Sequence, residues 1–214
     1  FMPIVFAFVF SKIPVSPGEE SEAIILFLAM PILMALTMTG AFVQAMIIAE
    51  EKEKHTLRTL MLTPATSAEV LLGKSFISTA LTFITIGVCV IASGQSVGAP
   101  LLFFTITVIC VILFVAFGTV MGLLSRSLQE TSVTGLPVMF IFLMGPMFGP
   151  MIDVDWLTTV VSYLPTHHFM EGVENLAQGG GLREIGTHLL NMSVWMVVAI
   201  VFSLFVYRKR RFDS

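Results

Sequence analysis

Charged residues are scarce in this sequence. Only 12% of its 214 residues are Asp, Glu, Lys or Arg, whereas 56% are hydrophobic. Soluble domains carry about twice that share of charge. The mean hydropathy of +0.95 therefore excludes a soluble domain, because so much apolar surface needs lipid around it.

The sequence has only two cysteines and shows no pattern of a secretory signal peptide. Cys89 and Cys110 both fall inside apolar stretches, so they indicate neither a disulfide framework nor a metal site. The first basic residue, Lys12, follows the first apolar run instead of preceding it, which argues against a secretory signal peptide. Since Phe1 stands inside an apolar run, we expect the natural chain to begin earlier.

Long uncharged windows predict an all-α integral membrane protein with six transmembrane helices. A bilayer crossing takes about 20 apolar residues. The uncharged stretch from residue 75 to residue 125 would be about 75 Å long as a helix, so two crossings must share it. The Gly- and Pro-containing segment 93–100 is the expected break. The predicted spans are 1–10 (partial), 23–49, 75–92, 101–124, 131–152 and 186–207.

Prolines and small residues mark special positions in these spans. Pro31 is expected to kink the second span, and the prolines of 131–152 should kink the fifth or change its direction. The pairs Gly118/Gly122, Gly145/Gly149 and Ala41/Ala45 have the four-residue spacing that permits close helix packing.

Basic residues predict the orientation. Nine of the 11 Lys and Arg residues fall in one alternating set of connections, and the other set holds only Lys12 and Arg183. The positive-inside rule places the first set in the cytoplasm. We therefore predict a multi-pass protein of the plasma (inner) membrane with both termini cytoplasmic. The nine are Lys52, Lys54, Arg58, Lys74, Arg126, Arg208, Lys209, Arg210 and Arg211.

The densest charge in the chain lies in the connection 50–74. Its first part can form a helix, since Glu50 and Lys54 are a favourable pair four residues apart, and Leu57, Leu60 and Met61 share a face. Pro64 would end that helix. Periodicity alone is equally consistent with an interfacial helix that anchors a loop.

The order of residues in this connection resembles type-2 exporter permeases of the ATP-binding cassette (ABC) class. The shared features are Glu-x-Glu-Lys, Thr56-Leu57, Leu60, Thr63-Pro64 and Gly73-Lys74 at the start of a span. The resemblance covers essentially the whole chain, which it implies is a single permease domain, 1–214. It implies that segment 50–74 is a coupling loop whose helix docks on a separate ATPase. The contact residues it implies are Glu51, Lys52, Lys54, His55, Leu57, Arg58 and Leu60.

The same resemblance implies the rest of the assembly. Two cassette ATPase subunits and a second permease chain, identical or homologous, are expected partners, together with membrane lipid and without nucleic acid. Gly73-Lys74-Ser75 is not a phosphate loop, because the required earlier glycine is replaced by Ala68. We therefore expect no cofactor on this chain and no ATPase activity of its own, with ATP and Mg bound by the partner.

The outer region 153–185 contains apolar pieces too short to cross a bilayer. The resemblance implies short re-entrant helices that help to close the exit route, and a loop resting on the membrane surface is the alternative. Polar residues at a water-exposed rim account for the histidine pair and Glu171, so we predict no metal site there. The expected gate residues are Trp156, Tyr163, Pro165, His167 and His168.

Three other functions compete with an exporter. An intramembrane enzyme needs titratable or nucleophilic groups at depth, and no recognisable set is present. An ion-coupled transporter or channel usually places charges along its pathway, whereas Gln44 and Asn191 are among the few strongly polar residues inside these spans. The third alternative is an accessory membrane subunit that only anchors or senses. The favoured function is outward transport by alternating access, driven by a separate ATPase.

Overall fold

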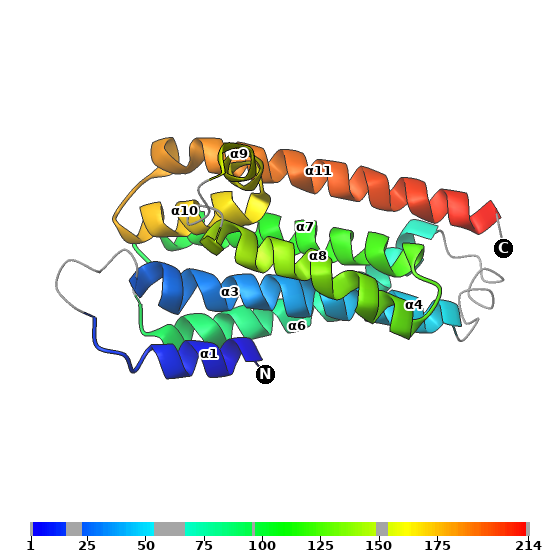
Figure 1. Cartoon of the computed structure of the whole chain (residues 1–214), viewed down its shortest axis with the longest axis horizontal. Helices are drawn as coiled ribbons and strands as arrows, with labels where there is room; N and C mark the ends of the chain where they lie inside the picture. The colour runs from blue at the N-terminus through cyan, green and yellow to red at the C-terminus, as the bar shows by residue number, and fades with distance from the viewer. Residues whose placement is uncertain (1, 16–22, 54–66, 96, 149–153, 213–214) are drawn as a thin grey trace.

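The computed structural model describes residues 2–15, 23–53, 67–95, 97–148 and 154–212, and within them the regular structure is entirely helical. The helices form an elongated bundle (Figure 1). Five of them are long and apolar enough to cross a membrane. The predicted partial first span corresponds to α1 (Met2–Phe10), whose nine residues are too few for a crossing.

The second predicted span is one continuous helix, Ile25–Glu53, with two π-helical stretches. Its parts are η1 (Ile25–Ala29), α3 (Met30–Met34), η2 (Ala35–Phe42) and α4 (Val43–Glu53). In η1 the N–H of Met30 donates to the carbonyl of Ile25, five residues earlier. Pro31 follows directly and has no N–H to donate. The expected irregularity at Pro31 is therefore a change in hydrogen-bond register.

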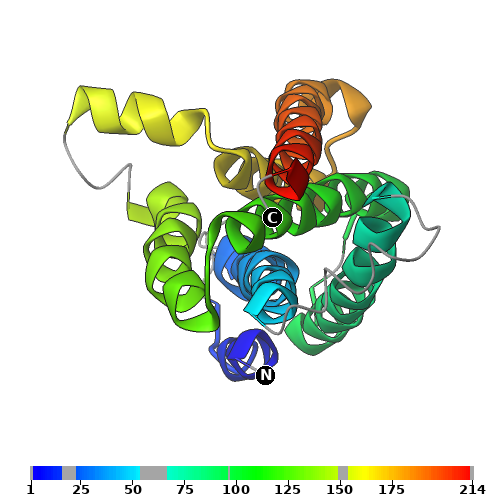
Figure 2. The same cartoon turned by 90° about the vertical axis from the view of Figure 1, so that its right-hand side faces the viewer.

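This helix lies at the centre of the bundle. Its apolar window is 67% buried, against 22–44% for the other four spans. Figure 2, which looks along the bundle, shows it surrounded by α1, α6, α7 and α8. Ile32, Leu33 and Leu36 are fully buried in the main apolar core.

The third and fourth spans are α6 (Ser67–Ser93) and α7 (Pro100–Leu124). The break between them falls within the predicted segment 93–100. Gly94 there has a φ of +65°, a left-handed conformation that suits the end of a helix. Pro100 opens α7 at a position where a missing N–H costs nothing.

The remaining spans are α8 (Leu128–Phe148) and α11 (Leu182–Phe212). Pro137 and Pro146 lie inside α8, which is a single helix over its described length. Residues 149–152, the end of the predicted fifth span, lie outside the described residues. Helix α11 extends beyond the predicted span 186–207 at both ends, because its terminal turns continue into polar sequence.

Between α8 and α11 stand two shorter helices, α9 (Asp155–Ser162) and α10 (Pro165–Ala177). Helix α9 is seen end-on in Figure 1 and lengthwise in Figure 2, so it crosses the bundle axis. Helix α10 runs roughly along that axis beside α11 (Figure 1). Its apolar face is buried, with Phe169 and Leu176 fully enclosed.

Candidate functional site: the charged end of the bundle

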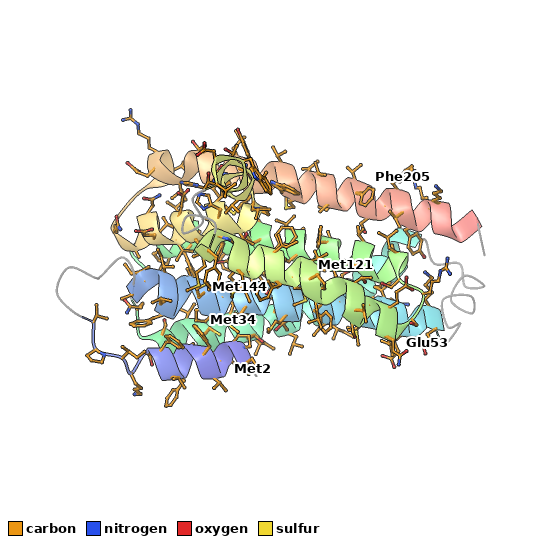
Figure 3. All side chains as sticks on the ribbon, in the orientation of Figure 1. Met2, Met34, Glu53, Met121, Met144 and Phe205 are labelled. Atoms are coloured by element: carbon orange, nitrogen blue, oxygen red, sulfur yellow. The ribbon has the colours of Figure 1, made fainter. Side chains whose placement is uncertain are left out.

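The ends of several spans meet at one end of the bundle. Helices α4, α7 and α11 finish there, and α6 and α8 begin there (Figure 1). Glu53 marks this end in Figure 3. The predicted coupling loop leaves the bundle from α4 and re-enters it at α6, so its base is described although residues 54–66 are not.

Four charged residues at this base connect neighbouring helices, and we call Glu51, Lys52, Glu53 and Lys74 the charged clamp. Lys52 Nζ donates to the carbonyl oxygens of Leu123 (2.9 Å) and Ser125 (2.6 Å). These carbonyls belong to the last turn of α7, where a cation also offsets the negative end of the helix dipole.

The two glutamates of the clamp reach the neighbouring spans. Glu51 on α4 forms an ion pair with Lys74 on α6. Glu53 Oε2 accepts a hydrogen bond of 3.0 Å from the backbone N–H of Leu128, at the start of α8. A carboxylate is favourable there, because the first N–H groups of a helix lack intrahelical partners. The last turn of α4 is thus bonded to α6, α7 and α8.

The sequence-predicted contact residues divide into two groups. Glu51 and Lys52 are described, and both have partners within the chain. Lys54, His55, Leu57, Arg58 and Leu60 lie outside the described residues. The prediction that these seven residues contact an ATPase stays a prediction.

A buried polar cluster lies between the same helices, deeper in the bundle. Gln44 is 0% exposed. Its Nε2 donates to Ser75 Oγ (3.0 Å) and Thr119 Oγ1 (2.9 Å), and its Oε1 accepts from Ser78 Oγ (2.7 Å). These bonds join α4, α6 and α7, so the amide that stood out in the sequence serves to connect spans.

Small residues bring α7 against the central helix. A Cβ added to Gly118 would lie 2.1 Å from the carbonyl oxygen of Ala41, and one added to Gly122 would lie 2.5 Å from that of Ala45. The predicted small-residue pairs of the two helices therefore face each other. The backbones approach to a distance that no larger side chain permits.

Four of the predicted gate residues lie at the junction of α9 and α10 or on the first turn of α10, and Trp156 lies at the opposite end of α9. Trp156 and Tyr163 are 69% and 65% exposed, and Pro165 is the buried first residue of α10. The carbonyl of Tyr163 accepts a hydrogen bond of 3.0 Å from Trp195 Nε1 on α11. Trp195 was not among the residues singled out in the sequence, because a lone tryptophan in a span gives no positional signal.

His167 and His168 stand on the first turn of α10. His167 Nε2 lies 3.2 Å from Glu171 Oε1, and His168 Nδ1 lies 2.9 Å from Nδ1 of His188 on α11. Burial and the neighbouring histidines lower the pKa of His168, against an opposing effect of Glu171. The sequence separates His188 from this group, so only the fold brings it there.

A family model described as ABC-2 family transporter protein matches residues 6–205. The chain belongs to the ABC-2 family. No curated protein sequence matches it. As an ABC-2 permease, the chain is a multi-pass membrane subunit of an ABC transporter, a family that in general works with a partner ATPase.

Proposed function

We propose that this ABC-2 permease moves a substrate outward by alternating access, with energy from two separate ATPase subunits that dock on the coupling loop 50–74. The observation that carries the proposal is the charged clamp. Lys52, Glu51 and Glu53 bond the last turn of α4 to α7, α6 and α8. A push on the loop would reach four spans through these bonds.

The charged end of the bundle faces the cytoplasm in this proposal, as the positive-inside rule requires. Both termini are then cytoplasmic, and the plasma (inner) membrane is the location. ATP and Mg bind to the partner ATPases, and this chain binds no nucleotide.

The outer helices α9 and α10 form a re-entrant pair. Support comes from the position of their junction along α11. The backbone carbonyl of Tyr163, at the junction, accepts a hydrogen bond from Trp195 Nε1, and Trp195 is 13 residues into α11. At 1.5 Å per residue, this is about 20 Å from the start of that helix. A segment that rested on the membrane surface would not reach the middle of a span. Trp156, Tyr163, Pro165, His167 and His168 would then line the closed exit.

A second permease chain, identical or homologous, completes the complex. Several spans expose large apolar side chains, such as Phe140 and Ile141 on α8. Phe205 on α11 is another, and it is labelled in Figure 3. Lipid and the second permease would share these surfaces. Adaptable Met and Phe side chains, 14 and 19 in number, suit a bulky amphipathic cargo.

Co-purification with the ATPase tests the docking. The chain is expressed with its cassette ATPase, and the retained ATPase is quantified for the wild type, for Leu57→Asp and for Arg58→Glu. Arg208→Glu, an exposed residue of the last turns of α11 at the same end of the bundle but outside the loop, is the control. We expect both loop variants to lose the ATPase while the control keeps it. Intact binding in the loop variants, or transport driven by an ion gradient without ATP, would contradict the proposal.

A further inference from the structure

We propose that His168, Glu171 and His188 form a binding site for a first-row transition-metal dication, with Zn²⁺ the best match. The site lies between α10 and α11, away from the charged clamp. It departs from the expectation of no metal site in this region, which was made without His188. It also goes beyond the proposed function, because it requires neither an ATPase nor transport.

The fold gathers three of the chain's four histidines in one place. His167 and His168 stand on α10, and His188 stands on α11. The donor atoms of His168, Glu171 and His188 all lie within 4.8 Å of one another. Glu171 is one turn after His168 on α10, so a short helix and a long span supply the site together.

The spacing of the donor atoms suits tetrahedral zinc. Ligands held 2.0–2.1 Å from the metal at tetrahedral angles lie about 3.3 Å apart. The two Nδ1 atoms of His168 and His188 are 2.9 Å apart, and Nδ1 of His188 is 3.6 Å from Glu171 Oε2. These two distances bracket the expected value, so small side-chain rotations would complete the geometry.

The donor set also has the right chemistry. Two neutral imidazoles and one carboxylate are common zinc ligands, and three protein ligands leave a fourth position for water or another group. The Nδ1 atoms of His168 and His188 face each other, and without a metal they can only share one proton in a hydrogen bond. A metal cation between them would accept a lone pair from each nitrogen.

A further side chain orients the carboxylate. His167 Nε2 contacts Glu171 Oε1, which leaves Oε2 directed at His188. Such outer partners fix the position of a ligand, and their loss typically lowers metal affinity about 10–100-fold. His167 is therefore a positioning residue of the site.

The site is reachable from water. The Glu171 side chain is 45% exposed, and those of His167 and His188 are 22% and 14% exposed. His188 is six residues into α11, about 9 Å from the start of the helix. A bound metal would fasten α10 to the first turns of α11 and stabilise the folded chain.

The test uses the full chain in detergent, freed of metal and then titrated with ZnCl₂ by calorimetry, with CoCl₂ absorption as a second readout. We expect one equivalent to bind, with the intense visible absorption of tetrahedral cobalt. His188→Ala and Glu171→Gln should each weaken binding more than about 100-fold, and His167→Gln about 10–100-fold. His55→Gln is the matched control, because it removes the remaining histidine.

Two results would overturn the site. One is that no stoichiometric Zn²⁺ binding is found in the wild type. The other is that affinity is unchanged in both His188→Ala and Glu171→Gln, while their helical circular dichroism shows that they are folded. Because the partner ATPase is not in the assay, either result leaves the docking proposal standing.

Discussion

The side chain of Gln44 joins three spans at a buried point. We predict that Gln44→Leu lowers stability by about 1–2 kcal/mol, because the hydroxyls of Ser75, Ser78 and Thr119 lose their partner in an apolar interior. Thermal unfolding of the purified chain measures the loss. Gln178→Leu, at the exposed end of α10, is the control and should leave the melting temperature unchanged. An equal melting temperature for both variants would contradict a structural role for Gln44.

A substitution at Lys52 can separate two roles of this region, which are binding of the ATPase and transmission of motion from α4 to α7. Its ammonium bonds to the last carbonyls of α7. We predict that Lys52→Met leaves the ATPase bound but reduces transport several-fold, because α4 loses its connection to α7. Co-purification and transport assays of the same variant measure the two effects, with Lys209→Met as the control. If Lys52→Met released the ATPase instead, its main role would be docking.

Individual residues were predictable to different degrees. Gln44 stood out because an amide is rare in an apolar window, and Gly118 and Gly122 because of their spacing. His188 could not be assigned to the histidine cluster, since no pattern in the sequence measures the distance between α10 and α11. Lys52 bonds to the carbonyls of Leu123 and Ser125, and a backbone carbonyl as a partner leaves no trace in the sequence.

At the scale of the helices, close packing of α7 against the central helix depends on glycine. We predict that Gly118→Ala destabilises the chain by about 1–3 kcal/mol, because the new Cβ would meet the backbone of Ala41 and force the helices apart. Gly87→Ala on α6 is the matched control, since nothing lies within 4 Å of its added Cβ. Alanine there should be neutral or stabilising by up to about 1 kcal/mol.

The comparison is made by thermal unfolding of the two variants under identical conditions. Equal destabilisation by both substitutions would indicate a general effect of helix propensity and not a close approach of α7 and η2. A third variant, Gly122→Ala, should behave like Gly118→Ala, because its Cβ would meet the carbonyl of Ala45.

The long helices were largely predictable and their ends were not. Apolar windows located the five spans of the described residues, since length and hydropathy are enough to detect a crossing. The helices overrun those windows because polar terminal turns stay helical outside an apolar stretch. The π-helical register around Pro31 was missed, because a proline indicates an irregularity without specifying its form.

At the scale of the whole molecule, the proposed mechanism makes this ABC-2 permease the chain that receives work at the coupling loop, and the charged clamp is the part that would pass it on. Spans α6, α7 and α8 are bonded to the last turn of α4. The mechanism therefore requires that motion at the coupling loop changes the opposite end of the bundle.

A distance between two labels at that opposite end tests this requirement directly. Spin labels are attached at Ile13→Cys and Gln178→Cys in a background with Cys89 and Cys110 replaced by alanine. The distance between the labels is measured by pulsed electron resonance in the complex with the ATPase, with and without ATP, Mg²⁺ and vanadate. We predict that trapped nucleotide shifts the distance in the chain with the wild-type loop, and that Lys52→Met, which keeps the ATPase bound but removes the bonds from α4 to α7, reduces the shift. A distance that nucleotide leaves unchanged, or that shifts equally in Lys52→Met, would contradict the account.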